Sequence, residues 1–472
     1  MSDLADSAGR QSERQTADRA GPASDRVIVF SKYPEPGYAK TRLIPCLGQG
    51  RAAKLQQHLS HHTFEVAREF CAGTGDRCWH VRFAGGSAEK MAAMFGDVVG
   101  RFLPQEGEGL GQRLQHATQA AFQDGVSKLL VIGTDCPAMS KDVLGRAFKK
   151  LSASDIVLGP ALDGGYYLIG MRAPKPLLFE NIAWGSDSVL KQTIAAAKRA
   201  KCNVVLLDPL ADVDHPEDLI HCRKWLGSTG GVLPKIQPRH WSIVIPTLNE
   251  QAKLPATLAR IPKSSEVQVV VADGGSEDDT VELARRWGAM VVQASPGRGR
   301  QMNAGAAVAR GQRLMFLHAD TRMPEGFLPA AEKVIESEAI AGCFELKIDG
   351  RETPLRWIER AVGWRSRHLQ QPYGDQALFL AADDFFQIGG FPNWPLMEDI
   401  EIARRLRQLG RIEVVGLPAI TSARRWQELG IARVTAINQL CRIGFAAGVS
   451  PERLAKFYRQ AVRRSKETSG NV

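Results

Sequence analysis

The chain begins the same strand-first pattern twice, and this repetition limits what it can fold into. An apolar strand over residues 26–30 opens an alternation of short strands and helices, and a second apolar strand followed by a helix opens at residue 241. Such alternation predicts a mostly parallel sheet with helices on both faces. We therefore expect an α/β protein with two tandem domains of this kind.

Turn-forming residues without periodicity separate the two patterns. Glycine and proline recur through residues 227–240, which is typical of a linker. The first residues of the chain are polar and small, as in a disordered tail. The predicted division is a tail over 1–24, a first domain over 25–227, a linker over 228–239 and a second domain over 240–472 that ends in basic helices.

Composition and charge limit the cellular compartments and the binding partners that we expect for this chain. The net charge of +10 favours anionic partners such as phosphorylated substrates, nucleotides, acidic lipids or nucleic acid. We find neither a run of about 18 apolar residues nor an apolar stretch after Met1, so we expect no spanning helix and no secretory signal. The eight cysteines have no Cys-x-x-Cys spacing, which argues against zinc and against a disulfide framework. We expect a cytoplasmic protein.

A loop that contains glycine, proline and basic residues follows the first strand. Lys40 and Arg42 lie in this loop, which spans residues 31–43. A strand, a glycine loop and basic side chains together suggest a phosphate-binding site. The pattern is not that of a P-loop, and a solvated basic loop explains it equally well.

Acidic residues follow later strands of the first domain. Asp135 comes after an apolar strand, Asp163 precedes two glycines, and Asp214 precedes a helix with Pro216 in its first turn. Ligands of α/β sheets bind at the carboxyl ends of the strands. We expect Asp135 and Asp214 to hold Mg²⁺ or Mn²⁺ and Asp163 to lie at the diphosphate of the donor. The structural alternative is a hairpin turn at Asp163 and a helix cap at Asp214.

Several stretches of the first domain resemble the nucleotide-diphospho-sugar transferase fold, and specifically the family named radical-SAM/selenodomain-associated transferase 1. The similar stretches are residues 30–43, 133–140, 159–170 and 212–219, and the resemblance covers about residues 26–227. It implies that Lys40 and Arg42 meet phosphates and that Asp135 meets a metal. The long glycine-rich opening of the related nucleotidyltransferases is absent here, so nucleotidyl transfer and glycosyl transfer both stay open.

The second domain has its own candidates for binding a nucleotide donor. Asp273 ends a fully apolar strand, where an isolated acid is costly unless it meets a ligand. Two glycines behind it let a flat ring or a ribose approach the backbone. Ser276 and Asp279 predict a capping pair for the following helix. Arg298 and Arg300 lie on a glycine-rich entry to another helix and suggest a diphosphate clamp.

The segment over residues 371–410 predicts an acceptor site that ends in a base. Asp375 and Gln376 precede an apolar run, and Glu398 with Asp399 opens a helix. A carboxylate in the first turn of a helix is stabilised as its anion and can remove a proton from a hydroxyl group. A plain helix start with acidic residues is the structural alternative.

Motifs of the second domain resemble the family 2 glycosyltransferases of the GT-A fold, closest to the group named radical-SAM/selenodomain-associated transferase 2. The motifs are Ile-Pro-Thr-Leu-Asn-Glu, Ala-Asp-Gly-Gly-Ser, His-Ala-Asp-Thr and Met-Glu-Asp, and the resemblance covers about residues 240–460. It implies that Asp273 contacts the nucleotide, with Pro246 and Glu250 at the donor. It also implies that Asp399, beside Glu398, is the base.

The metal motif of this family has one substitution in the chain. Asp320 matches the metal-binding acid of the Asp-x-Asp motif, whereas His318 stands in place of the first acid. Imidazole is a poorer ligand than carboxylate for Mg²⁺ but suits Mn²⁺. We expect Asp320 and His318 to hold a divalent metal, Mn²⁺ or Mg²⁺. The reaction that the resemblance implies is a single displacement at the anomeric carbon with inversion.

Apolar and basic residues alternate at helical spacing near the end of the chain, as at Trp426, Leu429, Arg433 and Arg442. A helix on an anionic membrane surface has this pattern. A packed helix whose arginines extend to solvent has it more often. We leave open a peripheral contact at the inner membrane face and an acceptor that is lipid-linked.

Three hypotheses follow. The chain is bifunctional, with a C-terminal inverting glycosyltransferase that moves a sugar from a nucleotide-sugar to a hydroxyl and an N-terminal nucleotidyl- or glycosyltransferase-like enzyme. Alternatively, only the C-terminal half is catalytic, and the other half is a nucleotide-binding or scaffolding module. In the third hypothesis the basic chain binds an anionic surface, membrane or nucleic acid. We expect a nucleotide or nucleotide-sugar substrate and no nucleic acid, because no basic helix with exposed aromatic residues stands out before the final helices.

Overall fold

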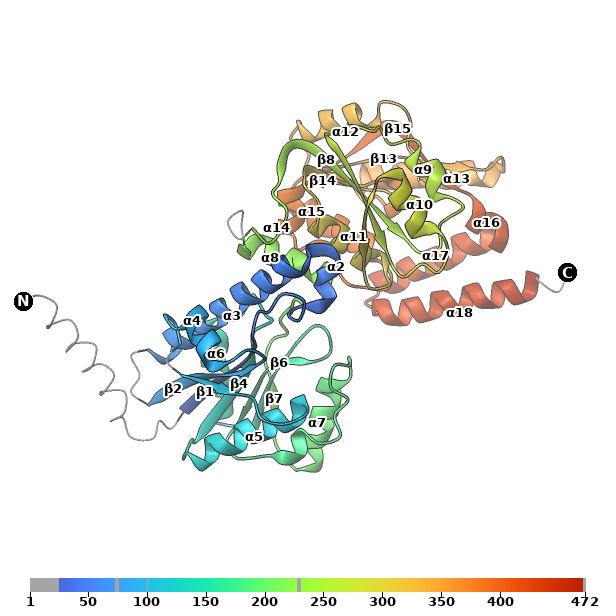
Figure 1. Cartoon of the computed structure of the whole chain (residues 1–472). Coiled ribbons are helices and arrows are strands. Elements are labelled where there is room, and N and C mark those ends of the chain that lie inside the picture. The colour runs from blue at the N-terminus through green and yellow to red at the C-terminus, as the bar shows by residue number, and fades with distance from the viewer. Residues whose placement is uncertain (1–24, 73–75, 100, 227–230, 470–472) are drawn as a thin grey trace, which may run out of the picture. The chain divides into compact units, whose positions relative to one another are not determined.

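The computed structural model describes residues 25–72, 76–99, 101–226 and 231–469, and the chain divides into two units between Asp214 and His215. Each unit has its own sheet with helices packed against it (Figure 1). The predicted tail over residues 1–24 lies outside the described residues.

The first unit contains a seven-stranded sheet in the order β3-β2-β1-β4-β6-β5-β7. Strand β6 runs antiparallel to both of its neighbours, and the other strand pairs are parallel. The strands are β1 (Asp25–Lys32), β2 (Arg77–Ala84), β3 (Phe102–Pro104), β4 (Lys128–Gly133), β5 (Ile156–Pro160), β6 (Tyr166–Met171) and β7 (Val204–Leu206). The helices are η1 (Thr41–Leu43), α2 (Ile44–Leu47), α3 (Gln49–Cys71), α4 (Ala88–Phe95), α5 (Leu110–Gln123), α6 (Lys141–Leu151), η2 (Pro176–Leu178) and α7 (Val189–Arg199).

Strand β1 shows why helices cover both faces of this sheet. Successive side chains of a strand point to opposite faces. Val27 and Val29 pack in a core cluster with residues of α3 and α6, whereas Ile28 packs in a second cluster with residues of α5 and α7. All three side chains are fully buried. A strand that is apolar on both faces therefore needs helices on both, as the sequence predicted.

The second unit contains an eight-stranded sheet in the order β10-β9-β8-β11-β14-β13-β15-β12. Strands β10, β9, β8 and β11 are parallel, and β14 is antiparallel to β11 and β13. The strands are β8 (Gln237–Thr247), β9 (Val267–Asp273), β10 (Met290–Gln293), β11 (Gly311–Phe316), β12 (Thr321–Arg322), β13 (Ala341–Asp349), β14 (Phe379–Ala381) and β15 (Ile412–Ser422).

The helices of the second unit are η3 (Pro216–Asp218), α8 (Leu219–Leu226), α9 (Leu254–Leu258), α10 (Thr280–Trp287), α11 (Arg298–Ala307), α12 (Phe327–Ile335), α13 (Thr353–His368), η4 (Gly374–Gln376), α14 (Ala382–Gln387), α15 (Glu398–Leu409), α16 (Arg424–Leu429), α17 (Ile431–Ala446) and α18 (Pro451–Ser469).

Helix α11 lies very close to the sheet. A Cβ atom on Gly305 would come 2.3 Å from Val244 Cγ1 of β8, so only glycine permits this approach. The prediction of two mostly parallel sheets flanked by helices is confirmed.

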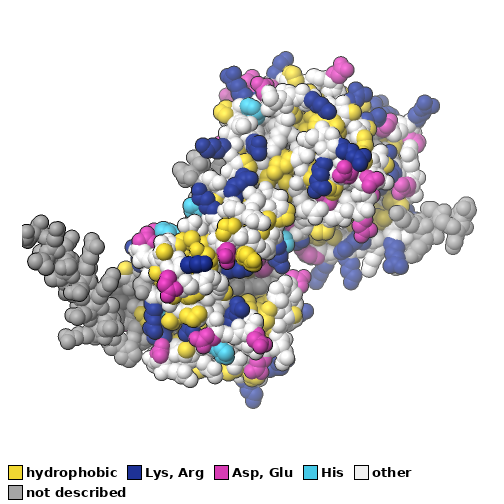
Figure 2. Space-filling view, viewed as in Figure 1, with side chains coloured by type: hydrophobic (Ala, Val, Ile, Leu, Met, Phe, Trp, Pro, Cys, Tyr) yellow, Lys and Arg dark blue, Asp and Glu magenta, His cyan; other side chains and the backbone are white. Residues whose placement is uncertain are grey.

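The final helices are partly packed and partly exposed. Ile437 and Cys441 of α17 are buried in a cluster with Met397, as the packed-helix alternative requires. Leu440 and Ile443 of the same helix are 56% and 65% exposed. Figure 2 shows lysine and arginine side chains interspersed with acidic ones on the face of each unit that is in view. Within the described residues, no helix combines the length and the apolar character that crossing a membrane requires.

Helix α8 belongs with the second unit, whereas we had placed it in the first domain. Its Arg223 donates through Nη2 to the backbone oxygen of Ala309 at 3.0 Å and through Nη1 to that of Pro234 at 3.1 Å. The side chain of Ile220 lies 2.9 Å from where Gly390 would carry a Cβ atom. Residues 228–230 of the predicted linker lie outside the described residues, and the domain bounds stay a prediction.

We expect a fragment that begins at His215 to be more stable than one that begins at Lys235, although both keep all of β8. The longer fragment retains the hydrogen bonds of Arg223 and the apolar contacts of α8, together worth about 1–3 kcal/mol. Thermal unfolding of both fragments, followed by circular dichroism, measures the difference. Equal midpoints would show that α8 adds nothing to the cooperative fold of this unit.

Candidate active sites

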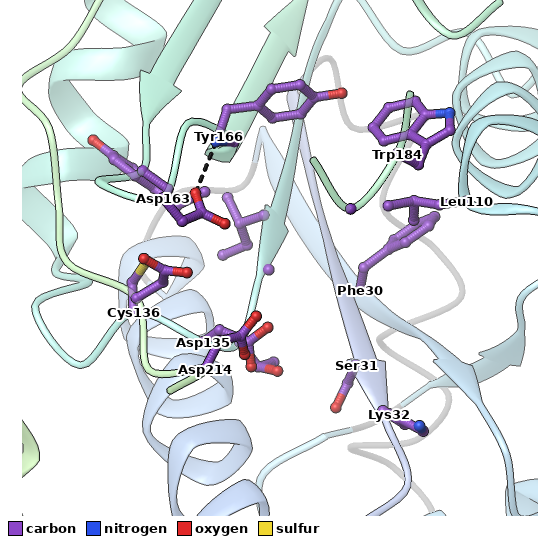
Figure 3. A pocket seen from close by; sticks show the side chains of 18 of the residues that line it. Phe30, Ser31, Lys32, Leu110, Asp135, Cys136, Asp163, Tyr166, Trp184 and Asp214 are labelled. Atoms are coloured by element: carbon purple, nitrogen blue, oxygen red, sulfur yellow. Dashed lines mark hydrogen bonds between the residues drawn. The ribbon is translucent and has the colours of Figure 1, made fainter. Parts of the chain in front are cut away.

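The first unit encloses a cavity of about 650 Å³ whose lining includes residues at the ends of β1 and β4. Figure 3 shows Asp163, Asp135 and Asp214 along one side of it and Phe30, Leu110 and Trp184 along the other. The loops after parallel strands meet at this edge of the sheet, which explains how residues far apart in the sequence line one cavity. The cavity therefore has an acidic side and an apolar, partly aromatic side.

Lys40 connects two of the predicted acids. Its Nζ atom lies 2.6 Å from Asp135 Oδ1 and 2.9 Å from Asp214 Oδ1, and its side chain is only 4% exposed. Burial alone would lower the pKa of Lys40, but the two carboxylates raise it above its ordinary value, so the amine stays charged. Arg42 Nη1 lies 3.8 Å from Asp214 Oδ2, and its side chain is 56% exposed.

Asp163 lies in the turn that the sequence offered as its structural alternative. Its Oδ1 atom accepts a hydrogen bond from the backbone N–H of Gly165 at 2.7 Å. Gly164 has φ +93°, and a Cβ atom there would come 2.1 Å from the backbone oxygen of Asp187. The turn therefore requires glycine at this position and holds the exposed carboxylate of Asp163 at the cavity wall.

In the second unit, Asp273 is fully buried at the end of β9, and its carboxylate is satisfied by nearby groups of the protein. Oδ2 accepts from the backbone N–H groups of Gly275 and Ser276, both at 2.9 Å. Oδ1 accepts from the hydroxyls of Ser276 at 2.5 Å and Thr247 at 3.2 Å. The burial of Asp273 thus needs no ligand, and its contact with a nucleotide stays a prediction. The predicted capping pair is wrong, because the Ser276 hydroxyl binds Asp273.

The turn after β8 brings Glu250 close to Asp320. Pro246 is buried in β8 opposite Ala272, three residues before a polar turn. Burial raises the pKa of Glu250, and the negative charge of Asp320 adds to this while Arg424 opposes it. Among the described residues the buried Oε2 atom of Glu250 has no hydrogen-bond partner.

His318 lies against the acceptor segment. A Cβ atom on Gly374 would come 2.7 Å from His318 Nε2, so the missing side chain of Gly374 makes room for the imidazole ring. Burial, with the positive charges of Arg298 and Arg425, lowers the pKa of His318 to about 3. The ring is therefore neutral near pH 7.

At the start of helix α15, Arg298 of the predicted diphosphate clamp contacts Glu398, the neighbour of the predicted base Asp399. Glu398 is 3% exposed, and its Oε1 atom lies 3.0 Å from Arg298 Nε, at the start of α11. Asp399 accepts the N–H of Ile400 at 2.9 Å and faces the N–H of Gly374 at 3.5 Å. Arg300 is exposed on the outer side of α11. The acids of α15, Arg298 and the acceptor segment therefore meet at one place.

The two predicted acceptor residues have different surroundings. Gln376 is fully buried, and its amide binds Ser366 Oγ at 2.9 Å and the backbone oxygen of Phe344 at 2.9 Å. These bonds hold the segment in place, and a contact of Gln376 with an acceptor stays a prediction. Asp375 differs, because its buried Oδ1 atom has no partner in the described part of the chain. A cavity of about 10 Å³, room for about one water, lies between Tyr373, Gly374 and Asp399.

The two halves of the chain match two different families. Residues 71–186 match a family described as an uncharacterized protein conserved in bacteria, DUF2064, and residues 242–391 match glycosyl transferase family 2. The chain joins a DUF2064 domain to a family 2 glycosyltransferase domain. The predicted fusion of two different domains is confirmed, as is the glycosyltransferase family of the second.

Individual relatives each match less than half of the chain. An uncharacterized glycosyltransferase of Mycobacterium tuberculosis is 33% identical over 136 residues, which are 27% of this chain and 59% of the relative. The chain thus spans under two thirds of that relative's length. A phosphoenolpyruvate guanylyltransferase of Chloroflexus aggregans is 27% identical over 186 residues, 39% of this chain and 89% of the relative.

Solved structures give similar matches. A protein of Desulfovibrio desulfuricans G20, named for the nucleotide-diphospho-sugar transferases, is 33% identical over 44% of this chain and 89% of its own, with a TM-score of 0.40. Glucosyl-3-phosphoglycerate synthase of Mycobacterium tuberculosis is 22% identical over 42% of this chain and 78% of its own, with a TM-score of 0.33. Its structure contains Mn²⁺, uridine-diphosphate-glucose and phosphoglyceric acid.

The residues predicted to bind metal fit a metal ion differently in the two domains. No group of three or more His, Cys, Asp or Glu side chains placed to hold a metal occurs within the described residues. In the DUF2064 domain the ammonium group of Lys40 donates hydrogen bonds to one oxygen of Asp135 and one of Asp214. The positive charge of Lys40 thus occupies the place between these acids, and they do not form a metal site from protein ligands alone. In the family 2 domain the unpartnered oxygen of Glu250, close to Asp320, fits a cation that phosphate oxygens complete.

Sequence reasoning missed Arg365 and the role of Tyr373. The Arg365 guanidinium lies 3.4 Å from the centre of the Tyr373 ring, and that of Arg442 lies 5.8 Å from it. Tyr373 was visible in the acceptor segment, but a helical arginine such as Arg365 carries no motif. Only the fold brings it to the segment.

We expect Asp375→Asn to stabilise the protein above about pH 6. Burial raises the pKa of Asp375 from 3.8 to about 6, with Asp399 adding to this and Arg365 opposing it. The folded state thus holds this proton more tightly than the unfolded state, and the wild type loses stability as the pH rises between these values. Asparagine does not ionise, so the variant gains about 1–2 kcal/mol at pH 7.5.

Chemical denaturation at pH 4 and pH 7.5 measures this effect. Most of the advantage of Asp375→Asn should disappear at pH 4, which lies well below the folded-state pKa of about 6 and close to the ordinary value of 3.8. Glu428→Gln, at an exposed position of α16, is the control and should change little at either pH. A variant less stable than the wild type at pH 7.5 would contradict the buried, unpaired acid.

Proposed function

We propose that the family 2 domain transfers a glycosyl group from a nucleotide-sugar to an acceptor hydroxyl with inversion. The observation that carries this proposal is the meeting of Arg298, Glu398 and Asp399 with the acceptor segment at the start of α15. Arg298, which can neutralise the leaving diphosphate, then lies close to Asp399, which can accept the proton of the acceptor hydroxyl. Those are the two groups that an inverting transfer needs.

Donor binding is assigned to the strand ends and to α11. Glu398 holds the guanidinium of Arg298 in place, and the exposed Arg300 extends the positive charge at the helix start. Both can contact the diphosphate, since arginine matches phosphate oxygens in pairs. Asp320 with Glu250 would hold a divalent metal, which would neutralise the charge of the leaving diphosphate. Asp273 shapes the loop against which the nucleoside lies.

The chemical step is assigned to Asp399. Its carboxylate takes the proton of the acceptor hydroxyl while the acceptor oxygen forms a bond to the anomeric carbon. The bond from that carbon to the diphosphate oxygen breaks in the same step, and the nucleoside diphosphate leaves with its electron pair. Attack from the face opposite the leaving group inverts the anomeric centre. The hydrogen bond from Ile400 N–H holds the carboxylate in the first turn of α15.

For the DUF2064 domain we propose binding of a nucleotide in the cavity of about 650 Å³. A planar base fits the apolar side near Trp184 and Phe30, and the phosphates fit the side where Arg42 is exposed. Likeness to a guanylyltransferase supports nucleotidyl transfer as the reaction. Lys40 is then a positioning residue that keeps Asp135 and Asp214 together.

Contact with an anionic membrane is a second candidate, favoured by the exposed Leu440 and Ile443 among the arginines of α17. It would place the protein in the cytoplasm, at the inner membrane face. Flotation with vesicles that contain acidic lipid, compared with neutral vesicles, separates this candidate from a freely diffusing enzyme.

We expect Asp399→Asn to lower glycosyl transfer by about 10²–10⁴-fold while nucleotide binding stays unchanged. The amide cannot accept the proton, but it keeps the size of the side chain. The measurement is transfer or slow donor hydrolysis on a panel of nucleotide-sugars, together with UDP binding by calorimetry. The control is Glu452→Gln on α18. Transfer near the wild-type rate would remove Asp399 as the base.

We expect Arg42→Gln and Lys40→Met to act differently on the first domain. Arg42 is exposed, so its loss should weaken nucleotide binding by about tenfold and leave stability unchanged. Lys40→Met should also lower the melting temperature, because Asp135 and Asp214 lose their shared cation. Calorimetry with a panel of nucleoside triphosphates measures both effects, with Lys54→Met as the exposed control. A Lys40→Met variant as stable as the wild type would contradict the positioning role.

A further inference from the structure

Buried polar atoms without partners gather around the acceptor segment. Within the described residues, the atoms Arg365 Nη2, Tyr373 Oη, Asp375 Oδ1 and Glu398 Oε2 are all shielded from solvent, and none makes a hydrogen bond. Folded proteins leave few such atoms, and each calls for an explanation. They come from α13, the acceptor segment and α15, so no single badly packed element accounts for them.

These groups lie close enough to act on one another. Asp399 and Asp375 are among the charges that shift the pKa of both Arg365 and Tyr373. Arg365 donates through Nε to the backbone oxygen of Gln371 at 2.9 Å, which ties α13 to the start of the segment. Four of the unpartnered atoms in this domain thus lie near the proposed base, and those of Glu250 and Glu352 do not belong to this group.

The backbone of the segment is strained near its start. Gln370, directly before the segment, and Ala377, within it, have φ values of 51° and 49°, in the left-handed region that favours glycine. Met397, directly before Glu398, has φ 71°. Strain of this kind persists where the surrounding structure enforces it, and it is common at binding sites.

Positive charge dominates the outer part of this group. Arg365 is 6% exposed and Arg442 is half-buried, and the guanidinium groups of both lie near the ring of Tyr373. In the described part of the chain neither forms an ion pair with a carboxylate, unlike Arg298, which pairs with Glu398. The forked donors of a guanidinium match the paired oxygens of a carboxylate or phosphate.

We propose that Arg365, Tyr373 and Arg442 form an acceptor subsite for a molecule that carries a carboxylate or phosphate close to its reacting hydroxyl. The anion lies against the two guanidinium groups, and the hydroxyl lies between Asp375 and Asp399. The proposal rests on the proposed glycosyl transfer for the role of Asp399, but the subsite itself is defined by binding. A free metabolite and a lipid headgroup share this chemistry.

Binding to the full chain in the presence of UDP and Mn²⁺ tests the subsite. The probes are glycerol 3-phosphate, glycerate and glycerol, followed by ligand-observed NMR, and vesicles of phosphatidylglycerol, followed by flotation. We expect both soluble anions to bind at least about tenfold more tightly than glycerol. Binding to the vesicles in preference to the soluble anions would identify a lipid headgroup as the source of the anion. Equal affinity for glycerol 3-phosphate and glycerol would overturn the proposal.

Variants separate the subsite from general charge and from the reaction. Arg442→Gln, on the surface of α17, and Arg365→Lys, which keeps the charge but loses the fork, should each weaken the binding of anions by about tenfold. Arg433→Gln on the same helix is the matched control and should change nothing. Anion binding that neither subsite variant weakens would contradict the assignment.

A final variant distinguishes failure of this inference from failure of the proposed function. Asp399→Asn should keep the binding of glycerol 3-phosphate and lose transfer. If UDP does not bind the wild type but the anions still do, the donor assignment is wrong and the subsite stands. If UDP binds and anions are not preferred, the subsite is wrong and the donor assignment stands.

Discussion

The family 2 domain depends on the ion pair between Arg298 and Glu398. Glu398 is 3% exposed. Burying an ionised carboxylate this far from water costs several kcal/mol of folding free energy unless a cation pairs with it. Arg298 opens α11 and Glu398 opens α15, so the pair fixes the starts of two helices relative to each other. Gly299 makes the approach possible, because a Cβ atom there would come 2.6 Å from the backbone oxygen of Pro392. The position of Asp399, one residue further on, follows from this contact.

The same region is where the backbone departs from ordinary conformations. Gln370, Ala377 and Met397 all adopt left-handed φ values without being glycine. Each such residue costs about 1–2 kcal/mol, which glycine would avoid. Ala377 and Met397 are buried and pack in core clusters, so their side chains hold the conformation from within. The structure thus accepts strain in and next to the acceptor segment.

The sequence predicted the sheets better than the side-chain partners. The alternation of apolar strands with helices was enough to predict two mostly parallel sheets. Acids that follow such strands, as Asp135 and Asp320 do, then lie at the carboxyl ends of the strands, where ligands bind. The partners of those acids were not predictable, because the path of a loop decides them. Lys40 reaches Asp135 only through a left-handed backbone with φ 48°. The place of α8 was also missed, since a helix beside a linker carries no mark of the sheet on which it packs.

Asp273 and Glu398, which are buried, and Asp375, which is partly buried, differ in how many hydrogen-bond partners the protein supplies. Asp273 accepts hydrogen bonds from its own loop and from Thr247 through both oxygens, so it would persist as a structural residue without any ligand. Glu398 is satisfied on one side only, by Arg298. Asp375 has a buried oxygen without a partner in the described residues and carries a raised pKa. Because an unpaired buried acid destabilises the fold, its presence beside Asp399 is best explained by a molecule that completes it.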